Sequence, residues 1–498
     1  WLKGELLQLS GASARTDIET SRRRIHLIKN ISIMVLNIGG GLEKIMVGVC
    51  MSSTFSDPPM LLIGGLLGAP LLLLTSGFIL WWAAGFKLVL AWFTFVTLAA
   101  YLWFSHSYMQ DGPAPIDKYI AFKDSATEKA WSGRRIPITT LGDLYLDDKL
   151  SFRGDVLEIL RDHRNEFCNY KLTWELVNFL IKQLFPNSEN SSLKDLQSTK
   201  KEIKEHYDRG NDWFSSFLGP RMVYTSAVFE GLDQSLETAQ DNKMSLICEK
   251  LMVRPGDSFL DIGCGWGSLV CHAAQHYGAT AAGVTLSVEG AKYCREQITE
   301  KGLDDSAKII VADYRDIPQE LRFKKIASIE MAEHVGLRNF QTYLGRVHDM
   351  LTDDGMFLMQ VAGLRQGSNW EDLSWGLFMS RYIFPGADAS TPLHWYVKQL
   401  ELAGFEVHSV ETIGRHYSHT LHRWYDNFQK NRADIEKKYG GYLCRLWDFF
   451  LAWSVVAAGQ GTAACYQLLV HKNTNSFPRD VYCEKAVAQK SVALKSTK

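Results

Sequence analysis

The chain has 498 residues, which is too many for one ordinary hydrophobic core and predicts two or three folded units. Hydrophobic residues make up 46% of it and charged residues 22%, a composition that excludes a chain disordered along its whole length. The net charge of −1 gives no electrostatic basis for nucleic-acid binding. The sequence contains neither a CxxC nor an HExxH motif, so no such spacing indicates a metal site.

Residues 1–58 carry no pattern that assigns them a structure, and a long apolar stretch follows them. Between Met60 and Phe104 the only charged side chain is Lys87. Because a helix needs about 20 apolar residues to cross the hydrocarbon core of a bilayer, residues 59–105 predict a transmembrane hairpin of two helices. A re-entrant hairpin within one leaflet and a buried hairpin of a soluble protein are the alternatives.

Either membrane hairpin would have its two flanks on the same side of the bilayer. Both flanks carry basic residues, namely the run Arg22-Arg23-Arg24, Lys118 and Lys123, which favours the cytoplasmic side. The sequence therefore predicts an integral membrane protein of the endoplasmic reticulum or another endomembrane, with the domain that follows the hairpin in the cytosol.

Beyond the hairpin, residues 106–194 contain loops rich in Gly, Pro, Ser and Asn, and they predict a linker and a small helical region. From residue 195 short apolar runs alternate with helix-length segments. The expected strands are 258–262, 279–286, 307–311, 326–329 and 356–361. This alternation is typical of an α/β, doubly wound, mostly parallel sheet, in which ligands lie at the carboxyl ends of the strands.

The strand at 258–262 leads directly into Gly263, Gly265 and Gly267, and a helix-compatible segment follows. Glycine permits a tight turn and lets the backbone approach a ligand closely, while the first turn of a helix offers free N–H groups. The spacing is neither that of a dinucleotide fingerprint nor that of a phosphate-binding P-loop. It predicts a loop for a nucleotide-type cofactor, with a plain glycine-rich turn as the alternative.

Five blocks in this half of the chain agree in order and spacing with those of a known enzyme family. They are His206-Tyr207-Asp208-Arg209-Gly210-Asn211-Asp212, Asp261-Ile262-Gly263-Cys264-Gly265-Trp266-Gly267, Asp313-Tyr314-Arg315-Asp316, Glu333-His334-Val335-Gly336 and Tyr382-Ile383-Phe384-Pro385-Gly386. Through them the chain resembles the class I S-adenosylmethionine methyltransferases and, within that class, the cyclopropane fatty acid synthase group. It is most similar to the fungal sphingolipid C9-methyltransferases, which join this domain to an N-terminal membrane hairpin.

The resemblance implies a Rossmann-like methyltransferase sheet within a domain over residues 195–471. The aromatic-rich part of this domain, residues 365–430, is expected to form a helical, lipid-binding cap over the site, with ordinary core packing as the alternative. Residues 472–498 are polar and are expected to form a tail.

The resemblance also implies S-adenosylmethionine as co-substrate. The implied contacts are Tyr224 and Thr225 for its methionine end, Asp261, Gly263, Gly265, Trp266 and Gly267 for the cradle of that end, Thr285 and Leu286 for the ribose, and Tyr314 and Arg315 for the adenine. Two features depart from the family. Gly290 stands where a Gln is usual, and no acidic residue follows the second strand to hold the ribose, for which Glu289 is the candidate substitute.

Methyl transfer to a carbon–carbon double bond generates a carbocation, which must be stabilised in a dry pocket before a proton leaves. In the cyclopropane synthases a bicarbonate held by a Cys, a Glu, a His and a Tyr removes that proton. This sequence retains Glu333 and Tyr417 but has Ser226 and Gln360 at the other two positions. The replacement of two bicarbonate ligands predicts that the proton lost differs from the one lost in the cyclopropane synthases. Loss of this other proton restores the double bond and gives a methyl branch.

The resemblance therefore implies methylation of C9 in the Δ8-unsaturated sphingoid base of glucosylceramide, a membrane lipid. Glu333, Tyr417, Ser226 and Gln360 are the predicted catalytic residues, and neither a metal nor a nucleic acid is expected. One alternative is a cyclopropane synthase that acts on phospholipid acyl chains, in which Ser226 and Gln360 are neutral changes. The other is a membrane-tethered lipid-binding protein with an inactive catalytic domain. An altered bicarbonate site, held in part by Ser226 and Gln360, is also left open.

Overall fold

The structure is a computed structural model that describes residues 91–98, 100–101, 112–170, 176, 210–367, 369–384 and 391–481. Nearly all of these residues lie in one unit, formed by Tyr101–Lys171 and Lys194–Lys498. The predicted hairpin at 59–105 falls outside the described residues apart from 91–98 and 100–101, which are helical. Residues 206–209 of the first family block, 385–386 of the last block and 482–498 of the predicted tail lie outside them as well. Within the ranges just given, no helix combines the length and the apolar character needed to cross a bilayer.

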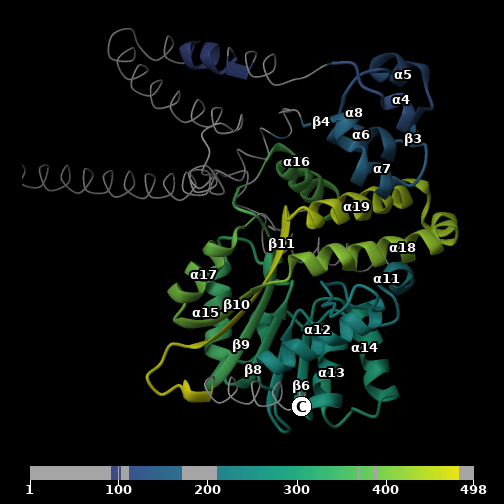
Figure 1. The fold of residues 1–498 in the computed structure, drawn as a ribbon. Helices are drawn as coiled ribbons and strands as arrows, with labels where there is room; N and C mark the ends of the chain where they lie inside the picture. Colours follow the sequence, from purple (N-terminus) through teal and green to yellow (C-terminus); the bar gives the residue numbers. More distant parts are fainter. Residues whose placement is uncertain are drawn as a thin grey trace, which may run out of the picture. The chain divides into compact units, whose positions relative to one another are not determined.

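A seven-stranded mixed sheet lies at the centre of this unit (Figure 1), in the order β10-β11-β9-β8-β5-β6-β7. Its parallel strands are β5 (Ser258–Ile262), β6 (Thr280–Thr285), β7 (Ala307–Val311), β8 (Phe323–Ile329) and β9 (Leu351–Leu364). An antiparallel edge is formed by β10 (Phe405–Thr412) and β11 (Ala463–Lys472). The five expected strands are confirmed, whereas the sequence does not predict the two antiparallel ones.

Helices cover both faces of the sheet (Figure 1). They are α12 (Leu236–Lys250), α13 (Ser268–Tyr277) and α14 (Val288–Glu300) on one face and α15 (Phe340–Met350) and α17 (Leu393–Leu402) on the other. Each face has its own cluster of buried apolar side chains. Phe259 of β5 belongs to one cluster and Leu260 to the other, as the alternation of side chains along a strand requires. The sheet is therefore buried on both faces. Because β5 to β9 are parallel, the loops that follow them lie at the same edge of the sheet.

Residues 112–170 form a set of short elements within the same unit. They are α4 (Ile116–Tyr119), β1 (Ile120–Phe122), α5 (Ser125–Trp131), β2 (Ile136–Pro137), α6 (Ile138–Leu146), β3 (Leu150–Phe152), α7 (Val156–Asp162), α8 (Arg164–Phe167) and β4 (Cys168–Asn169). Two long helices, α18 (Gly414–Tyr439) and α19 (Gly441–Gly459), lie side by side (Figure 1). The same unit also contains α11 (Asn211–Leu218), α16 (Trp370–Phe378), the π-helical η3 (Met379–Ile383) and the short 3-10 helices η1 (Tyr314–Asp316) and η2 (Ala332–His334).

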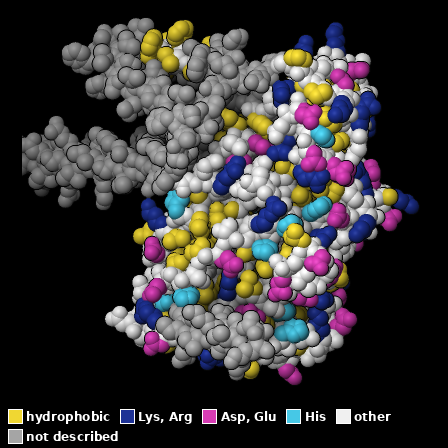
Figure 2. Space-filling model, viewed as in Figure 1, with side chains coloured by type: hydrophobic (Ala, Val, Ile, Leu, Met, Phe, Trp, Pro, Cys, Tyr) yellow, Lys and Arg dark blue, Asp and Glu magenta, His cyan; other side chains and the backbone are white. Residues whose placement is uncertain are grey.

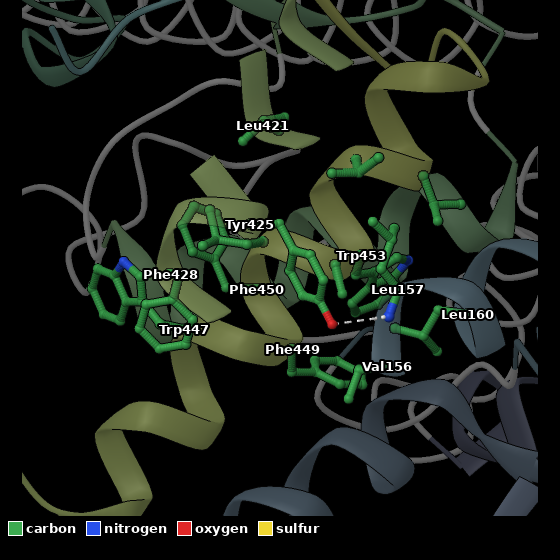
Figure 3. Close-up of a cluster of buried hydrophobic side chains, with 14 of the residues drawn as sticks. Val156, Leu157, Leu160, Leu421, Tyr425, Phe428, Trp447, Phe449, Phe450 and Trp453 are labelled. Carbon is green, nitrogen blue, oxygen red and sulfur yellow. Dashed lines mark hydrogen bonds between the residues drawn. The ribbon is translucent and has the colours of Figure 1, made fainter. Parts of the chain in front are cut away.

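A buried apolar cluster joins residues 112–170 to the two long helices (Figure 3). Leu157 of α7 lies in it with Tyr425 of α18 and Trp453 of α19, and all three side chains are at least 97% buried. The backbone N–H of Leu157 donates to the Tyr425 hydroxyl at 3.4 Å, and that hydroxyl donates to Asp155 at 2.8 Å. The segment that the sequence assigns to a linker and a small helical region therefore shares a core with α18 and α19.

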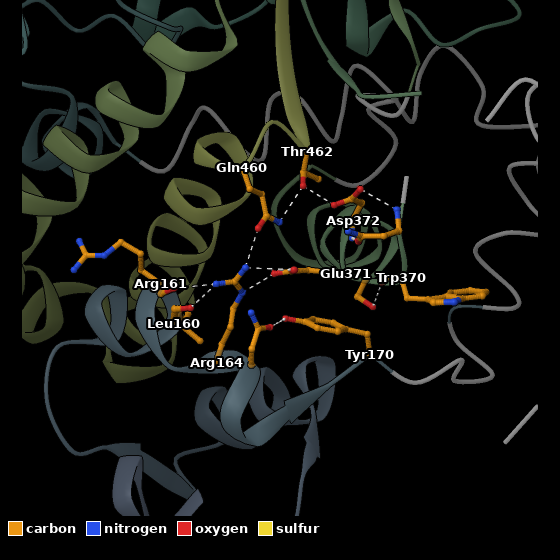
Figure 4. Close-up of polar contacts among 12 residues, drawn as sticks. Leu160, Arg161, Arg164, Tyr170, Trp370, Glu371, Asp372, Gln460 and Thr462 are labelled. Carbon is orange, nitrogen blue, oxygen red and sulfur yellow. Dashed lines mark hydrogen bonds and ion pairs between the residues drawn. The ribbon is translucent and has the colours of Figure 1, made fainter. Parts of the chain in front are cut away.

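A buried ion pair makes a second connection between these parts (Figure 4). Arg164 of α8 donates to Glu371 of α16 at 2.7 Å and to Gln460, the residue after α19, at 2.8 Å. Both charged side chains are only 9% exposed. Because an uncompensated buried charge is costly, the pair fixes α8 against α16 and the end of α19.

Charged side chains of both signs are spread over the face of the molecule that Figure 2 shows. Figure 2 shows lysines and arginines interspersed with acidic side chains over the visible face, with hydrophobic side chains in smaller groups between them. This mixture agrees with the net charge of −1 for the chain.

Candidate active site

A cavity of about 190 Å³ opens at the carboxyl ends of β5, β6, β7 and β8. All sequence-predicted contacts for the co-substrate except Gly267 line it, namely Tyr224, Thr225, Asp261, Gly263, Gly265, Trp266, Thr285, Leu286, Tyr314 and Arg315. Residues that are far apart in the sequence thus meet where a parallel sheet places its ligands.

The glycine loop has the backbone conformation that only glycine adopts readily. Gly263, Gly265 and Gly267 have φ angles of +80°, +55° and +75°. A Cβ at Gly263 would lie 2.4 Å from Cγ of Met331, and one at Gly267 would lie 1.9 Å from Sγ of Cys294. A Cβ at Gly265 would meet no atom within 4 Å, so this glycine leaves open space beside the cavity. Gly267 thus permits the turn of the loop into α13, which it caps at its N-terminus, although it does not line the cavity.

Two buried charged side chains stand beside this loop. Asp261 is 3% exposed, its Oδ1 has no hydrogen-bond partner, and burial raises its pKa to about 7. Lys243 of α12, which sequence reasoning missed, is 2% exposed and donates to the Thr225 hydroxyl at 2.9 Å. Burial lowers the pKa of Lys243, and the nearby carboxylates oppose this effect. A carboxylate and an ammonium group that line one cavity fit a ligand that carries both an amine and a carboxylate, as the methionine end of S-adenosylmethionine does.

Tyr314 and Arg315, in the segment after β7, line another part of the cavity. Tyr314 lies edge-on to Tyr343, with ring centroids 5.3 Å apart, and burial raises the pKa of Tyr314 to about 12. Arg315 donates to the Asp313 carboxylate at 2.7 Å through its Nε. A neutral aromatic ring beside a fixed ion pair suits a planar heterocycle such as adenine.

The structure gives a reason for one of the two departures from the family. A Cβ at Gly290, in the first turn of α14, would lie 2.8 Å from the carbonyl oxygen of Gly265. A larger residue there would push the glycine loop away from the helix. Glu289 is exposed and does not line the cavity, whereas Ser287 does and also caps α14 by accepting from the Gly290 N–H.

Three of the four predicted catalytic residues converge on a fifth residue, Glu330, which sequence reasoning missed. Gln360 donates to Oε1 of Glu330 at 2.7 Å, and the Tyr417 hydroxyl donates to Oε2 at 2.8 Å. Ser226 donates to Oε1 at 3.0 Å through its backbone N–H, while its hydroxyl donates to the carbonyl oxygen of Ala227. Glu330 also lines the cavity.

Two further features mark Glu330. It follows β8 directly and has a φ of +53°, a conformation that costs a non-glycine residue of order 1–3 kcal/mol. Its backbone N–H donates to the carbonyl oxygen of Gln360 at 2.7 Å, which helps to hold this conformation. In addition, the Cys465 thiol donates to Oε1 of Glu330 at 3.6 Å, so Cys465 belongs to this cluster.

Glu333, the fourth predicted catalytic residue, has a different environment. It lies in the short η2 helix (Ala332–His334) and is 6% exposed. One carboxylate oxygen accepts from the backbone N–H of Ala362, and the other has no hydrogen-bond partner. Burial, with the nearby charge of Glu330, raises the pKa of Glu333 to about 8. Glu333 is not among the residues that line the cavity, and its catalytic role stays a prediction.

Aromatic side chains form a wall beside this carboxylate cluster. The ring of Tyr224 lies 5.6 Å from that of Phe214, 5.5 Å from that of Trp424 and 6.2 Å from that of Phe384. Within the stretch expected to form a cap, Trp424 and Phe384 therefore pack against the cavity-lining Tyr224, although neither lines the cavity itself. By contrast, Trp395 packs on Phe340 in the layer that covers the sheet.

Comparison with known proteins gives a family. The family model described as mycolic acid cyclopropane synthetase matches residues 194–468. Sphingolipid C9-methyltransferase 2 of Gibberella zeae is 43% identical over 369 residues, which cover 73% of this chain and 70% of that protein. The sphingolipid C9-methyltransferase of Komagataella phaffii is 42% identical over 378 residues, which cover 74% and 76%.

Solved structures agree with this result. The fold of a cyclopropane synthase from Mycobacterium tuberculosis superimposes with a TM-score of 0.52 at 26% identity, over 56% of this chain and all of that one. A mycolic acid cyclopropane synthase in complex with SAH and CTAB gives a TM-score of 0.53 at 25% identity, over 55% and 98%. The chain therefore belongs to the mycolic acid cyclopropane synthetase family, and it is an S-adenosylmethionine-dependent methyltransferase with the class I α/β fold.

Proposed function

We propose that the protein transfers the methyl group of S-adenosylmethionine to C9 of the Δ8-unsaturated sphingoid base of glucosylceramide and so produces a 9-methyl branch. The observation that carries this proposal is the position of the Glu330 cluster and the aromatic wall directly beside the co-substrate cavity. The identity of 42–43% to curated sphingolipid C9-methyltransferases supports the choice of lipid.

The chain's own residues would divide the work as follows. S-adenosylmethionine supplies, when bound, an electrophilic methyl group on a positively charged sulfur. Asp261 and Lys243 would hold its methionine end, and the glycine loop would let it lie against the backbone. The ring of Tyr224, which lines the cavity and packs on Trp424, would face the cationic carbon that forms in the lipid. A desolvated ring can stabilise a cation by about 2 kcal/mol.

The test is to incubate the protein with methyl-labelled S-adenosylmethionine and Δ8-unsaturated glucosylceramide and to analyse the lipid by mass spectrometry and NMR. We expect a product one CH₂ heavier with a methyl signal on a double bond. A cyclopropane signal would instead support the cyclopropane synthase alternative, to which the name of the family points. Absence of label from the lipid would favour an inactive lipid-binding protein.

We also propose that residues 59–105 form a hairpin in the endoplasmic reticulum or another endomembrane, with the catalytic domain in the cytosol. The stretch between Met60 and Phe104, with Lys87 as its one charged residue, supports this proposal, as does a lipid substrate that resides in membranes. Membranes that contain the full chain should retain it after alkaline carbonate extraction. Release into the supernatant would contradict the hairpin.

A further inference from the structure

The Glu330 carboxylate is held from three sides by groups that come from different elements. Ser226 lies in the loop before α12, Gln360 in β9 and Tyr417 in α18. Together they give Oε1 two donors and Oε2 one, all within 3.0 Å. A carboxylate with this many donors is fixed in orientation.

A relay of hydrogen bonds shows that Gln360 must be a donor toward Glu330. Lys250 donates to Oε1 of Gln467 at 2.6 Å, and an ammonium group can only donate. The amide nitrogen of Gln467 must then face Gln360, where it donates to Oε1 at 2.8 Å. This leaves the amide nitrogen of Gln360 toward Glu330, so Oε1 of Glu330 accepts this hydrogen bond.

The third donor is kept in its neutral, donating form. Burial, together with the charge of Glu330, holds the pKa of Tyr417 well above its ordinary value. The tyrosine therefore donates its proton in a hydrogen bond without losing it. Glu333, three residues away, is buried, does not line the cavity, and has a pKa raised to about 8. Of the two neighbouring carboxyl groups, Glu330 is the one that both faces the cavity and is surrounded by donors.

We propose that the carboxylate of Glu330 is the general base of the reaction and takes the place of a bound bicarbonate. The inference rests on the proposed function. The π electrons of the C8=C9 bond form the new bond from C9 to the methyl carbon while the C–S bond breaks, which leaves a neutral sulfide and a positive charge on C8. The C9–H electron pair then re-forms the double bond, and the proton passes to an oxygen of Glu330. Because Glu330 lines the cavity, it can later release this proton to solvent.

Glu330→Gln tests the proposal because it keeps the size of the side chain and removes the base. We expect kcat to fall by about 100-fold or more, the range of general-base catalysis, with calorimetric S-adenosylmethionine affinity within about 3-fold of wild type. Glu401→Gln, at an exposed position in α17, is the matched control and should retain wild-type turnover. Turnover of Glu330→Gln within about 3-fold of wild type would overturn the proposal.

Glu330→Gly adds a readout that a merely structural role would not change. Glycine adopts a φ of +53° without strain, and its small size vacates the site of the carboxylate. We expect formate to restore part of the lost turnover in this variant and to leave the wild type unaffected. Wild-type activity should also be unchanged in buffer freed of carbon dioxide.

Two results would overturn the proposal, namely absence of rescue by formate in a variant that still binds S-adenosylmethionine, or loss of wild-type activity on removal of bicarbonate. Failure of the proposed function looks different. In that case the wild type itself would leave Δ8-unsaturated glucosylceramide unmethylated, before any variant is compared.

Discussion

At the scale of single residues, two carboxyl groups three positions apart have opposite environments. Glu330 accepts four hydrogen bonds at the edge of the cavity, whereas one oxygen of Glu333 is buried without a partner. Paired carboxyl groups with contrasting surroundings are a common arrangement in acid–base sites. In this pair Glu330 lines the cavity, whereas Glu333 is buried beside it and has a pKa raised to about 8.

Glu333 should make the stability of the protein fall as the pH rises. Its pKa is about 8 in the folded protein, above the ordinary value of 4.5, so between these values the folded state binds more protons than the unfolded state. The free energy of unfolding then decreases with pH across this window. Glu333→Gln removes the titration, so the variant should lose less stability than wild type between about pH 5 and about pH 8.

Urea unfolding of both proteins at the two ends of this window measures the effect. Asp261, whose pKa is raised to about 7, gives a slope of the same sign. Only the difference between wild type and Glu333→Gln therefore reports on Glu333. Parallel slopes for the two proteins would show that Glu333 titrates normally.

Gly263→Val should abolish binding of S-adenosylmethionine. A Cβ at this position meets Met331 at 2.4 Å, and the φ of +80° disfavours any side chain, so the loop must move out of the cavity. Gly302→Val is the matched control, since Gly302 has a φ of +65° and open space around it. It should cost about 1–2 kcal/mol of stability and keep the affinity. Calorimetry that finds normal affinity in Gly263→Val would contradict the role of the loop.

Sequence reasoning found the glycine loop and missed Glu330 and Lys243 for physical reasons. Three glycines directly after a buried strand predict a tight turn, and their positive φ angles confirm this prediction. The position of the Glu330 carboxylate depends on a φ of +53° and on donors from three distant segments of the chain. The residues next to Glu330 in the sequence reveal neither of these features. Lys243 lies in α12, whose sequence does not separate a polar face from an apolar one. A lysine in such a helix is expected to be exposed, although this one is buried.

At the scale of elements, the parallel strands of the sheet could be predicted from the sequence, whereas the two antiparallel strands could not. The parallel strands β5 to β9 follow from apolar runs that alternate with helices along the chain, a pattern that sequence alone reveals. The edge strand β10 is largely exposed along its length, and β11 pairs with β9 across about a hundred residues of sequence. Their place depends on long-range pairing, so the mixed character of the sheet could not be predicted.

The ion pair between α8 and α16 offers a test at this scale. Arg164→Ala leaves Glu371 buried without its partner and should destabilise the protein by about 3–5 kcal/mol. Arg164→Met combined with Glu371→Leu removes both charges and fills the space, so it should be closer to wild type than the single variant. Urea unfolding of all three proteins measures the difference. A single variant as stable as wild type would mean that water replaces the lost contact.

At the scale of the whole molecule, residues 112–170 and the methyltransferase sheet should unfold together. The apolar cluster of Figure 3 links α7 to α18 and α19, and α18 carries Tyr417, which contacts Glu330. A loss of packing around α7 should therefore reach the active site through α18.

Leu157→Ala removes a buried side chain from this cluster and should cost about 2–5 kcal/mol. Because the cluster is shared, the temperature at which tryptophan fluorescence changes and the temperature at which S-adenosylmethionine binding is lost should fall by the same amount. Val410→Ala, at an exposed position of β10, is the control and should shift neither by more than the equivalent of about 0.5 kcal/mol. Two separate transitions, with binding retained after the first, would instead mean that residues 112–170 unfold independently of the catalytic domain.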